Sequence, residues 1–104
     1  PTWLAPEQVR VLSISEKFND AANDAVAALA DAGVRVSADR NADKVGAKIR
    51  LARLDRVPYM IIIGAREAES GTVSVRHRDR DDLGAMPVNE FVRNIQQEIA
   101  NREL

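Results

Sequence analysis

The sequence predicts an α/β fold with three layers, a sandwich in which three helices cover a mixed five-stranded sheet with one antiparallel strand. Two observations lead to this prediction. Strand-like and helix-like stretches alternate over the first 64 residues, and this order gives parallel strands joined by right-handed crossovers, with helices on both faces. A fourth strand-like run follows the third after a short loop, and so short a connection favours antiparallel pairing beside it.

The N-terminal part of the chain contains two predicted strands and one helix. Residues 9–14 (VRVLSI) become continuously apolar after a short alternation, which is typical of a strand buried on both faces. A helix is predicted from Asn19 through an alanine-rich run to Ala32, because Gly33 stands where a helix C-cap belongs. Residues 34–39 (VRVSAD) form the second predicted strand.

The middle of the chain predicts a helix and two further strands. Residues 44–57 form the second predicted helix, which ends before Pro58. Residues 59–64 (YMIIIG) are the most hydrophobic strand candidate, so we expect this strand at the centre of the sheet. Gly71 closes a loop that leads to the fourth strand at residues 72–78 (TVSVRHR).

The C-terminal part adds a short fifth strand at residues 82–86 and a third helix at residues 88–102. Pro87 suits the first turn of this helix. Apolar residues recur at helical spacing and predict a face that packs on the sheet. This stripe consists of Val88, Phe91, Val92, Ile95 and Ile99.

Composition limits the classes of protein to which the chain can belong. A length of 104 residues predicts one domain, residues 1–104, and a hydrophobic content of 45% suits a packed core. The absence of cysteine excludes disulfides and thiolate metal sites. Because no apolar run is as long as a membrane span and no signal peptide is recognisable, we expect a cytoplasmic protein without a membrane partner. The start at Pro1 without methionine predicts a piece of a longer chain.

The net charge of −1 conceals a basic segment between two acidic ones. Residues 44–80 carry nine Lys and Arg against four acids, a balance of +5, whereas residues 1–43 and 81–104 each have a balance of −3. An anionic partner responds to the local field and not to the net sum. The pattern therefore predicts a polyanion bound on one surface.

Two rows of arginine are predicted on neighbouring elements. Alternation along the fourth strand places Thr72, Ser74, Arg76 and Arg78 on one face, and Arg80 continues the row if the strand extends. Arginine forks hydrogen-bond guanine edges, grip phosphates and stack on unpaired bases, so the rows predict a site for single-stranded RNA. The alternative is solvated surface charge, partly paired with nearby acids. The helix row consists of Arg50, Arg53 and Arg56.

A series of short motifs runs in order through nearly the whole chain. They are WLAP at residues 3–6, GVRV at 33–36, DKVGAKIR at 43–50, RVPYM at 56–60, GAREAESG at 64–71, VSVRHR at 73–78, DLG at 82–84 and QQEI at 96–99. On these motifs the chain resembles the C-terminal anticodon-binding domain of threonyl-tRNA synthetases, which are class II aminoacyl-tRNA synthetases. The related domains of prolyl, histidyl and glycyl enzymes share the fold but fit the motifs less well.

The resemblance implies a site for the threonine tRNA anticodon, which recognises the central G and the following U. The family's contact residues fall on Arg50, Arg56, Glu67 and Arg76. By their chemistry, Arg76 or Arg56 would engage the O6 and N7 edge of guanine, and Arg50 would hold a base or a phosphate. Glu67 only accepts when ionised, which suits a guanine N1 or N2 donor or a uracil N3 donor. Salt-sensitive contacts to the RNA backbone are expected from Lys44, Lys48, Arg53, Arg78 and Arg80.

One position departs from the family pattern. Family members commonly have R-N-E-K before the second helix, and the asparagine contacts the anticodon. Here residues 40–44 are RNADK, so an ungapped alignment places Ala42 at the asparagine position and Asn41 one residue earlier. We expect Asn41 to contribute through a local shift of the loop, and the alternative is that the contact is lost.

The resemblance also implies a parent enzyme, a threonine–tRNA ligase. Its ATP-dependent threonylation, with Mg²⁺ and Zn²⁺, would take place in an upstream catalytic domain that this chain lacks. We therefore expect no cofactor, no metal and no catalytic residue in residues 1–104. The expected partners are the anticodon loop of threonine tRNA and the catalytic domain of the same polypeptide. The parent is expected to be a homodimer and the piece alone a monomer.

Two other classes of function are considered. The first is a free-standing or repurposed module of the same ancestry without cognate tRNA specificity, and the departure at Ala42 keeps it open. The second is a small α/β enzyme, which has little support because the sequence has no glycine-rich phosphate loop, metal cluster or nucleophile–base pair. His77, the single histidine, shares a predicted strand face with valines and is expected to be structural.

Overall fold

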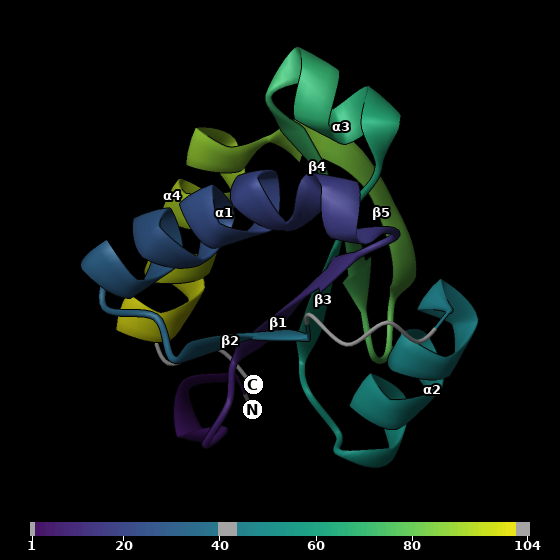
Figure 1. The fold of residues 1–104 in the computed structure, drawn as a ribbon. Helices are drawn as coiled ribbons and strands as arrows, with labels where there is room; N and C mark the ends of the chain where they lie inside the picture. The colour runs from purple at the N-terminus through teal and green to yellow at the C-terminus, as the bar shows by residue number, and fades with distance from the viewer. Residues whose placement is uncertain (1, 40–43, 102–104) are drawn as a thin grey trace.

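The chain forms one sheet of five strands in the order β2–β1–β3–β4–β5 (Figure 1). The computed structural model describes residues 2–39 and 44–101, with the backbone alone at Asp81. β1 pairs in parallel with β2 and β3, whereas β4 pairs antiparallel with β3 and β5. This confirms the predicted mixed sheet with one antiparallel strand. The strands are β1 (Val9–Ser13), β2 (Val36–Asp39), β3 (Tyr59–Ile63), β4 (Thr72–His77) and β5 (Asp81–Pro87).

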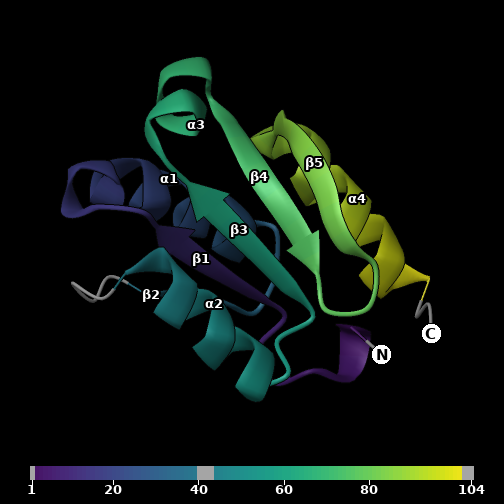
Figure 2. The same ribbon diagram turned by 90° about the vertical axis from the view of Figure 1, so that its right-hand side faces the viewer.

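Long helices cover both faces of the sheet, as predicted. α1 (Asn19–Asp31) and α4 (Val88–Ala100) lie on one face and α2 (Val45–Leu54) on the other (Figures 1 and 2). On its face α2 lies over the β1 side of the sheet, and β4 and β5 have none of these three helices above them there (Figure 2). Two 3₁₀ helices precede β1 and α1, namely η1 (Thr2–Leu4) and η2 (Glu16–Phe18).

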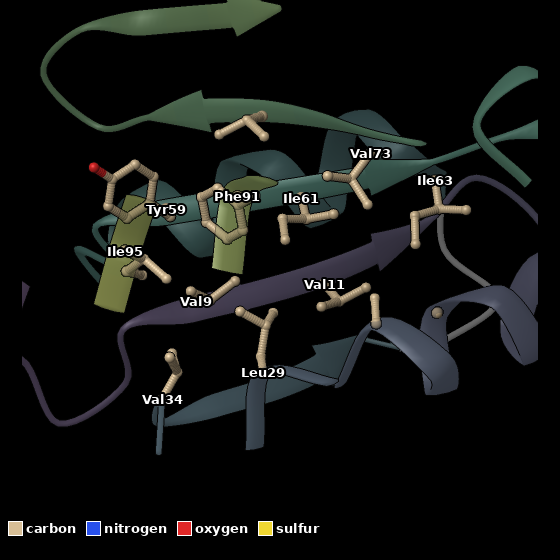
Figure 3. Close-up of a cluster of buried hydrophobic side chains, with 13 residues drawn as sticks. Val9, Val11, Leu29, Val34, Tyr59, Ile61, Ile63, Val73, Phe91 and Ile95 are labelled. Carbon is tan, nitrogen blue, oxygen red and sulfur yellow. The ribbon is translucent and has the colours of Figure 1, made fainter. Parts of the chain in front are cut away.

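The main hydrophobic core lies between the sheet and the layer of α1 and α4. Alternate residues of each strand point into it, where they meet side chains of both helices (Figure 3). Val9, Val11 and Ile61 are buried there against Leu29 of α1 and Phe91 of α4. Full burial of one such side chain stabilises the fold by about 1.5–3 kcal/mol, so this layer supplies most of the hydrophobic stabilisation.

A smaller core holds α2 against the other face. Leu12 of β1 and Met60 of β3 point to this side and are buried with Ala52 of α2 and with Val57. Successive side chains of a strand point to opposite faces of the sheet, so these residues alternate with the strand residues of the main core. The packing fixes the end of α2 close to the part of the sheet that α2 leaves uncovered.

The segment between β3 and β4 differs from the prediction. Residues 65–70 were expected in a loop, but they form the short helix α3 (Ala65–Ser70). Oε1 of Glu67 accepts a hydrogen bond from the amide of Gly64 at 2.8 Å, and Gly71 ends the helix with a φ of 70°. Caps rather than an apolar stripe define so short a helix, so periodicity did not reveal it.

Candidate nucleic-acid interface

A pocket lined mainly by arginine lies where the end of α2 approaches the end of β4. Its volume is about 720 Å³, and the described residues that line it are Arg53, Arg56, Arg78 and Asp79. Among these residues, three guanidinium groups against one carboxylate give an excess of positive charge. The two predicted rows of arginine, one on α2 and one on β4, therefore meet at this pocket.

The α2 helix ends in a turn that usually selects glycine. The amide of Arg56 donates to the carbonyl of Arg53 (3.1 Å) and the amide of Val57 to that of Ala52 (3.2 Å), which is the hydrogen-bond pair of a Schellman motif. Arg56 has a φ of 57°, and no other non-glycine residue in the described part of the chain has a positive φ. The left-handed conformation costs an ordinary residue about 1–2 kcal/mol. Backbone strain of this kind concentrates at functional sites, and Arg56 itself lines the basic pocket.

Replacing Arg56 by glycine is expected to separate stability from RNA binding. In Arg56→Gly the turn is no longer strained, so the free energy of unfolding should stay unchanged or rise by up to about 1 kcal/mol. RNA affinity should fall, because an exposed guanidinium is removed. Urea denaturation and RNA titration measure the two effects. If stability and affinity fall together, the Arg56 side chain supports the fold instead.

Arg78 joins the end of β4 to the end of α2. Its amide donates to the carbonyl oxygen of Pro58, and its Nη1 donates to the carbonyl oxygen of Arg56, both at 3.0 Å. Its Nε lies 3.7 Å from Oδ2 of Asp79, a loose ion pair. The main chain of Arg56 and the side chain of Arg78 are thus held together, so the guanidinium of Arg78 has a defined position relative to the turn that carries Arg56.

Arg76 lies on the same face of the sheet, on the strand that leads into the pocket. Its neighbours Val73 and Val75 point into the main core, so Arg76 points to the α2 side. In the sheet register it lies between Met60 of β3 and Asp82 of β5. Its Nε is buried and has no hydrogen-bond partner among the described residues. A buried donor without a partner costs about 1–3 kcal/mol, so a change of rotamer that brings this group to an acceptor of a bound molecule would be favourable.

The exposed side of α2 extends the basic surface. Arg50 and Arg53 are both exposed and stand three residues apart on neighbouring positions of the helix. Lys44, directly before the first residue of α2, is exposed as well. Three of the predicted arginines therefore meet in one pocket, and a further arginine lies on the helix beside it.

Lys48 does not belong to this exposed surface. Its side chain points into the fold, where the residue is 3% exposed. Nζ donates to the carbonyl oxygens of Ser13 (3.0 Å) and Asp39 (3.2 Å), at the ends of β1 and β2. This burial contradicts the expectation of a contact between Lys48 and the RNA backbone. The ammonium group instead fastens α2 to the sheet.

Arg80 also departs from the expectation, because it turns to the opposite side of the sheet. β4 ends at His77, so the alternation does not continue to Arg80. Its Nη2 donates to the hydroxyl oxygen of Tyr59 at 2.7 Å and lies 3.8 Å from Oε1 of Glu98 on α4. An intramolecular cluster next to α4 thus takes the place of the expected RNA backbone contact.

Glu67 is not brought into the pocket. Its capping hydrogen bond to Gly64 holds it beyond the end of β3, whereas the pocket adjoins the start of that strand, and four residue steps along a strand span about 13 Å. One hydrogen bond leaves the carboxylate with further lone pairs, so Glu67 retains acceptor capacity. Asn41 and Ala42 lie outside the described residues.

His77 closes the turn that follows β4. Its Nδ1 accepts hydrogen bonds from the amides of Asp79 (3.1 Å) and Arg80 (3.3 Å), which requires that this nitrogen be unprotonated. Burial and then the charge of Arg80 lower the pKa of His77. The ring also contacts Tyr59 edge-on, with centroids 4.8 Å apart. Neutral His77 therefore supports the turn beside the arginine pocket.

Stability is expected to fall on mild acidification because of His77. Its pKa in the folded state is lowered, so between that pKa and the unfolded value of about 6.5 the unfolded chain binds more protons and the free energy of unfolding rises with pH. Urea denaturation at pH 7.5 and 5.5 should show lower stability at pH 5.5. The variant His77→Phe keeps a ring beside Tyr59 but does not titrate. An equal pH dependence in both proteins would contradict this assignment.

Asp55, which the sequence suggested only as a possible partner for the arginine rows, instead forms an ion pair with Arg10 below the end of α2. Asp55 is the C-cap residue, and its Oδ2 lies 2.9 Å from Nη2 of Arg10. Nε and Nη2 of Arg10 each donate to Glu7 at 2.8 Å; these bonds lower the pKa of Glu7 and raise that of Arg10. A carboxylate is unfavourable at the negative end of a helix dipole. An acid at a predicted helix end is the signal that could have revealed the pair.

No helix in residues 2–39 and 44–101 is both long and apolar enough for a transmembrane span. No group of three or more His, Cys, Asp and Glu side chains in this part of the chain is placed to hold a metal ion.

The chain spans about one sixth of the length of the curated relatives that it matches. The sequence model of the family described as "Anticodon binding domain" matches residues 8–98. The chain is 53% identical over 103 residues to a threonine–tRNA ligase of Clostridium perfringens and 51% identical over 104 residues to one of Syntrophomonas wolfei. These matches cover 99% and 100% of this chain but 16% of each relative.

The fold is also similar to solved structures. The RNA binding domain of threonyl-tRNA synthetase from Cryptosporidium parvum Iowa II has a TM-score of 0.89 and 33% identity, over 93% of this chain and 24% of that chain. Prolyl-tRNA synthetase from Cryptosporidium parvum, complexed with halofuginone and AMPPNP, has a TM-score of 0.84 and 27% identity, over 98% and 23%. The predicted family and fold are confirmed: the chain belongs to the anticodon binding domain family.

Proposed function

We propose that residues 1–104 form one domain that binds the anticodon loop of threonine tRNA as part of a longer threonine–tRNA ligase. The observation that supports this most directly is the arginine pocket between α2 and β4, on the same side of the sheet as Arg76 with its unpartnered Nε. Guanidinium groups suit both the edges of unpaired bases and the phosphates between them. The sequence similarity to threonine–tRNA ligases supports threonine tRNA as the ligand.

Within this proposal the anticodon contacts come from five side chains. Arg76 or Arg56 engages the O6 and N7 edge of the central G, since a guanidinium fork matches these two acceptors. Arg50 holds a base or a phosphate, and Glu67 accepts from a guanine or uracil N–H group with its remaining lone pairs. Asn41 adds a contact from the loop before α2. Backbone phosphates are attracted by Lys44, Arg53 and Arg78.

The wider role of the domain is to position tRNA for a reaction elsewhere in the parent. Threonylation with ATP, Mg²⁺ and Zn²⁺ belongs to the catalytic domain of the same polypeptide, which is the second partner of this piece. The parent acts as a homodimer in the cytoplasm, and the piece alone is a monomer. Binding several parts of one tRNA at once raises the affinity beyond that of the single domain, so we expect only moderate affinity for the piece alone.

A titration with RNA tests the proposed function. The ligand is an anticodon stem-loop of threonine tRNA, and the control is the same loop with A in place of the central G, both at low and moderate salt. Tighter binding of the G loop is the expected result. Equal and steeply salt-dependent binding of both loops would favour the alternative, a repurposed module of the same ancestry that attracts RNA without recognising its sequence.

A further inference from the structure

The ion pair between Asp55 and Arg10 lies directly below the turn that carries Arg56. We propose that Asp55 is a positioning residue, which holds this turn in the geometry needed for base-specific RNA recognition. The inference rests on the proposed function and adds a specificity determinant to it. Asp55 itself is not assigned a contact with RNA.

Two consecutive residues at the end of α2 are of types that are unfavourable at their positions in a helix end. Asp55 places a carboxylate at the negative end of the helix, and Arg56 takes up a left-handed conformation that glycine would adopt without strain. Local choices normally agree with the fold, and adjacent exceptions concentrate at functional sites. Two contacts from outside the helix reach this turn, the hydrogen bond of Arg78 to the carbonyl oxygen of Arg56 and the ion pair of Arg10 with Asp55.

Arg10 is a rigid anchor for this purpose. Its side chain is 12% exposed and makes two hydrogen bonds to Glu7, which in turn accepts one from Ser37 of β2. The Nη2 group that bonds Glu7 also reaches Asp55. Arg10 therefore cannot follow Asp55 if the helix end moves, and the ion pair ties the turn to the sheet.

The sheet register links this anchor to the RNA-binding side chains. Arg10 pairs with Met60, and Met60 pairs with Arg76, so the three residues form one row across β1, β3 and β4. Two strand spacings separate the outer members by roughly 10 Å. Asp55 thus fixes the end of α2 over the row that contains Arg76. In the turn at this helix end, the carbonyl oxygen of Arg56 accepts the hydrogen bond from Arg78.

Charge and position predict opposite effects for a change at Asp55. Removal of an acid beside a basic pocket should strengthen RNA binding if only the charge matters. Loss of the anchor should weaken binding, and it should do so most for the base that the arginines recognise. Asp79 supplies the control, because it lines the arginine pocket, its side chain is 76% exposed, and it makes only a loose pair with Arg78 at 3.7 Å.

The test compares Asp55→Asn with Asp79→Asn in the G and A stem-loop titrations. Both variants remove one negative charge from the pocket region. Asp79→Asn should bind both loops about twofold more tightly, as expected for one screened charge. Asp55→Asn should bind the G loop about three- to tenfold more weakly and lose preference for G over A, as expected for a misplaced base contact. Asp55→Glu should restore part of the preference.

Amide hydrogen exchange gives a second readout that does not depend on RNA. The amides of Arg56 and Val57, which form the turn, should exchange faster in Asp55→Asn but not in Asp79→Asn, while core amides such as that of Ile61 stay protected. Unchanged amide exchange at the turn in Asp55→Asn overturns the proposal. A change of RNA affinity in the same direction in Asp55→Asn and Asp79→Asn overturns it as well. If wild type shows no preference for G, the proposed function fails, and the exchange data alone then decide whether Asp55 positions the turn.

Discussion

Arg76→Ala is expected to weaken binding of the cognate stem-loop by about 1–3 kcal/mol and to abolish the preference for G over A. Arg76 has a buried Nε without a partner among the described residues, and it faces the uncovered side of β4. If a guanine edge supplies the missing acceptor, the hydrogen bonds between it and Arg76 are lost entirely in the alanine variant. The G loop should therefore lose more affinity than the A loop, and fluorescence titration with both loops measures the difference.

Two further variants show whether charge or geometry causes the loss. Arg76→Lys keeps the charge but lacks the planar fork, so its salt dependence should match wild type while discrimination is lost. Arg53→Ala removes an exposed pocket arginine, and it should weaken both loops alike and reduce the salt slope by about 1. If Arg76→Ala weakens both loops equally, Arg76 is a phosphate contact and the assignment of base recognition to it is wrong.

Lys48→Met is expected to destabilise the fold by about 1–3 kcal/mol, because it leaves two carbonyl oxygens at the ends of β1 and β2 without their charged donor. The residue is 3% exposed, and its two hydrogen bonds tie α2 to Ser13 and Asp39. Methionine fills a similar volume without a donor group. Urea denaturation measures the change, and the salt dependence of RNA binding should not be altered.

Lys44→Met serves as the control on the same helix. Lys44 is exposed just before α2, so its replacement should leave the unfolding free energy nearly unchanged and reduce the salt slope of RNA binding by about 1. The two lysines thus distinguish a structural cation from a phosphate contact. A reduced salt slope in Lys48→Met would show that Lys48 reaches the RNA after all.

Most of the fold could be predicted because its elements have clear local signals. The apolar run at residues 59–63 and the helical stripe on α4 identify elements by their periodicity. Short caps were harder: α3 depends on Glu67 and Gly71, and the end of α2 depends on a Schellman turn without glycine. In both cases hydrogen bonds between a few groups decide the structure, and these do not appear as periodicity.

The candidate site was predicted only in part, because a basic residue in a pattern does not show where its side chain ends. Arg53, Arg56 and Arg78 meet in one pocket as the two rows suggested. Lys48 shares the basic segment of the chain but is buried at a strand end. Arg80 has the right parity but follows the last residue of β4.

The sequence by itself determined the order of the elements, the mixed sheet, the family and the set of basic residues from which a site is built. These properties depend on local periodicity, turn residues and motifs that are present in the chain before it folds. Only the tertiary structure decided which cations are available to a ligand. It also decided that Asp55 forms an ion pair with Arg10. Burial, strand register and the geometry of a helix end arise from packing between distant segments, so they exist only once the sheet and α2 have come together.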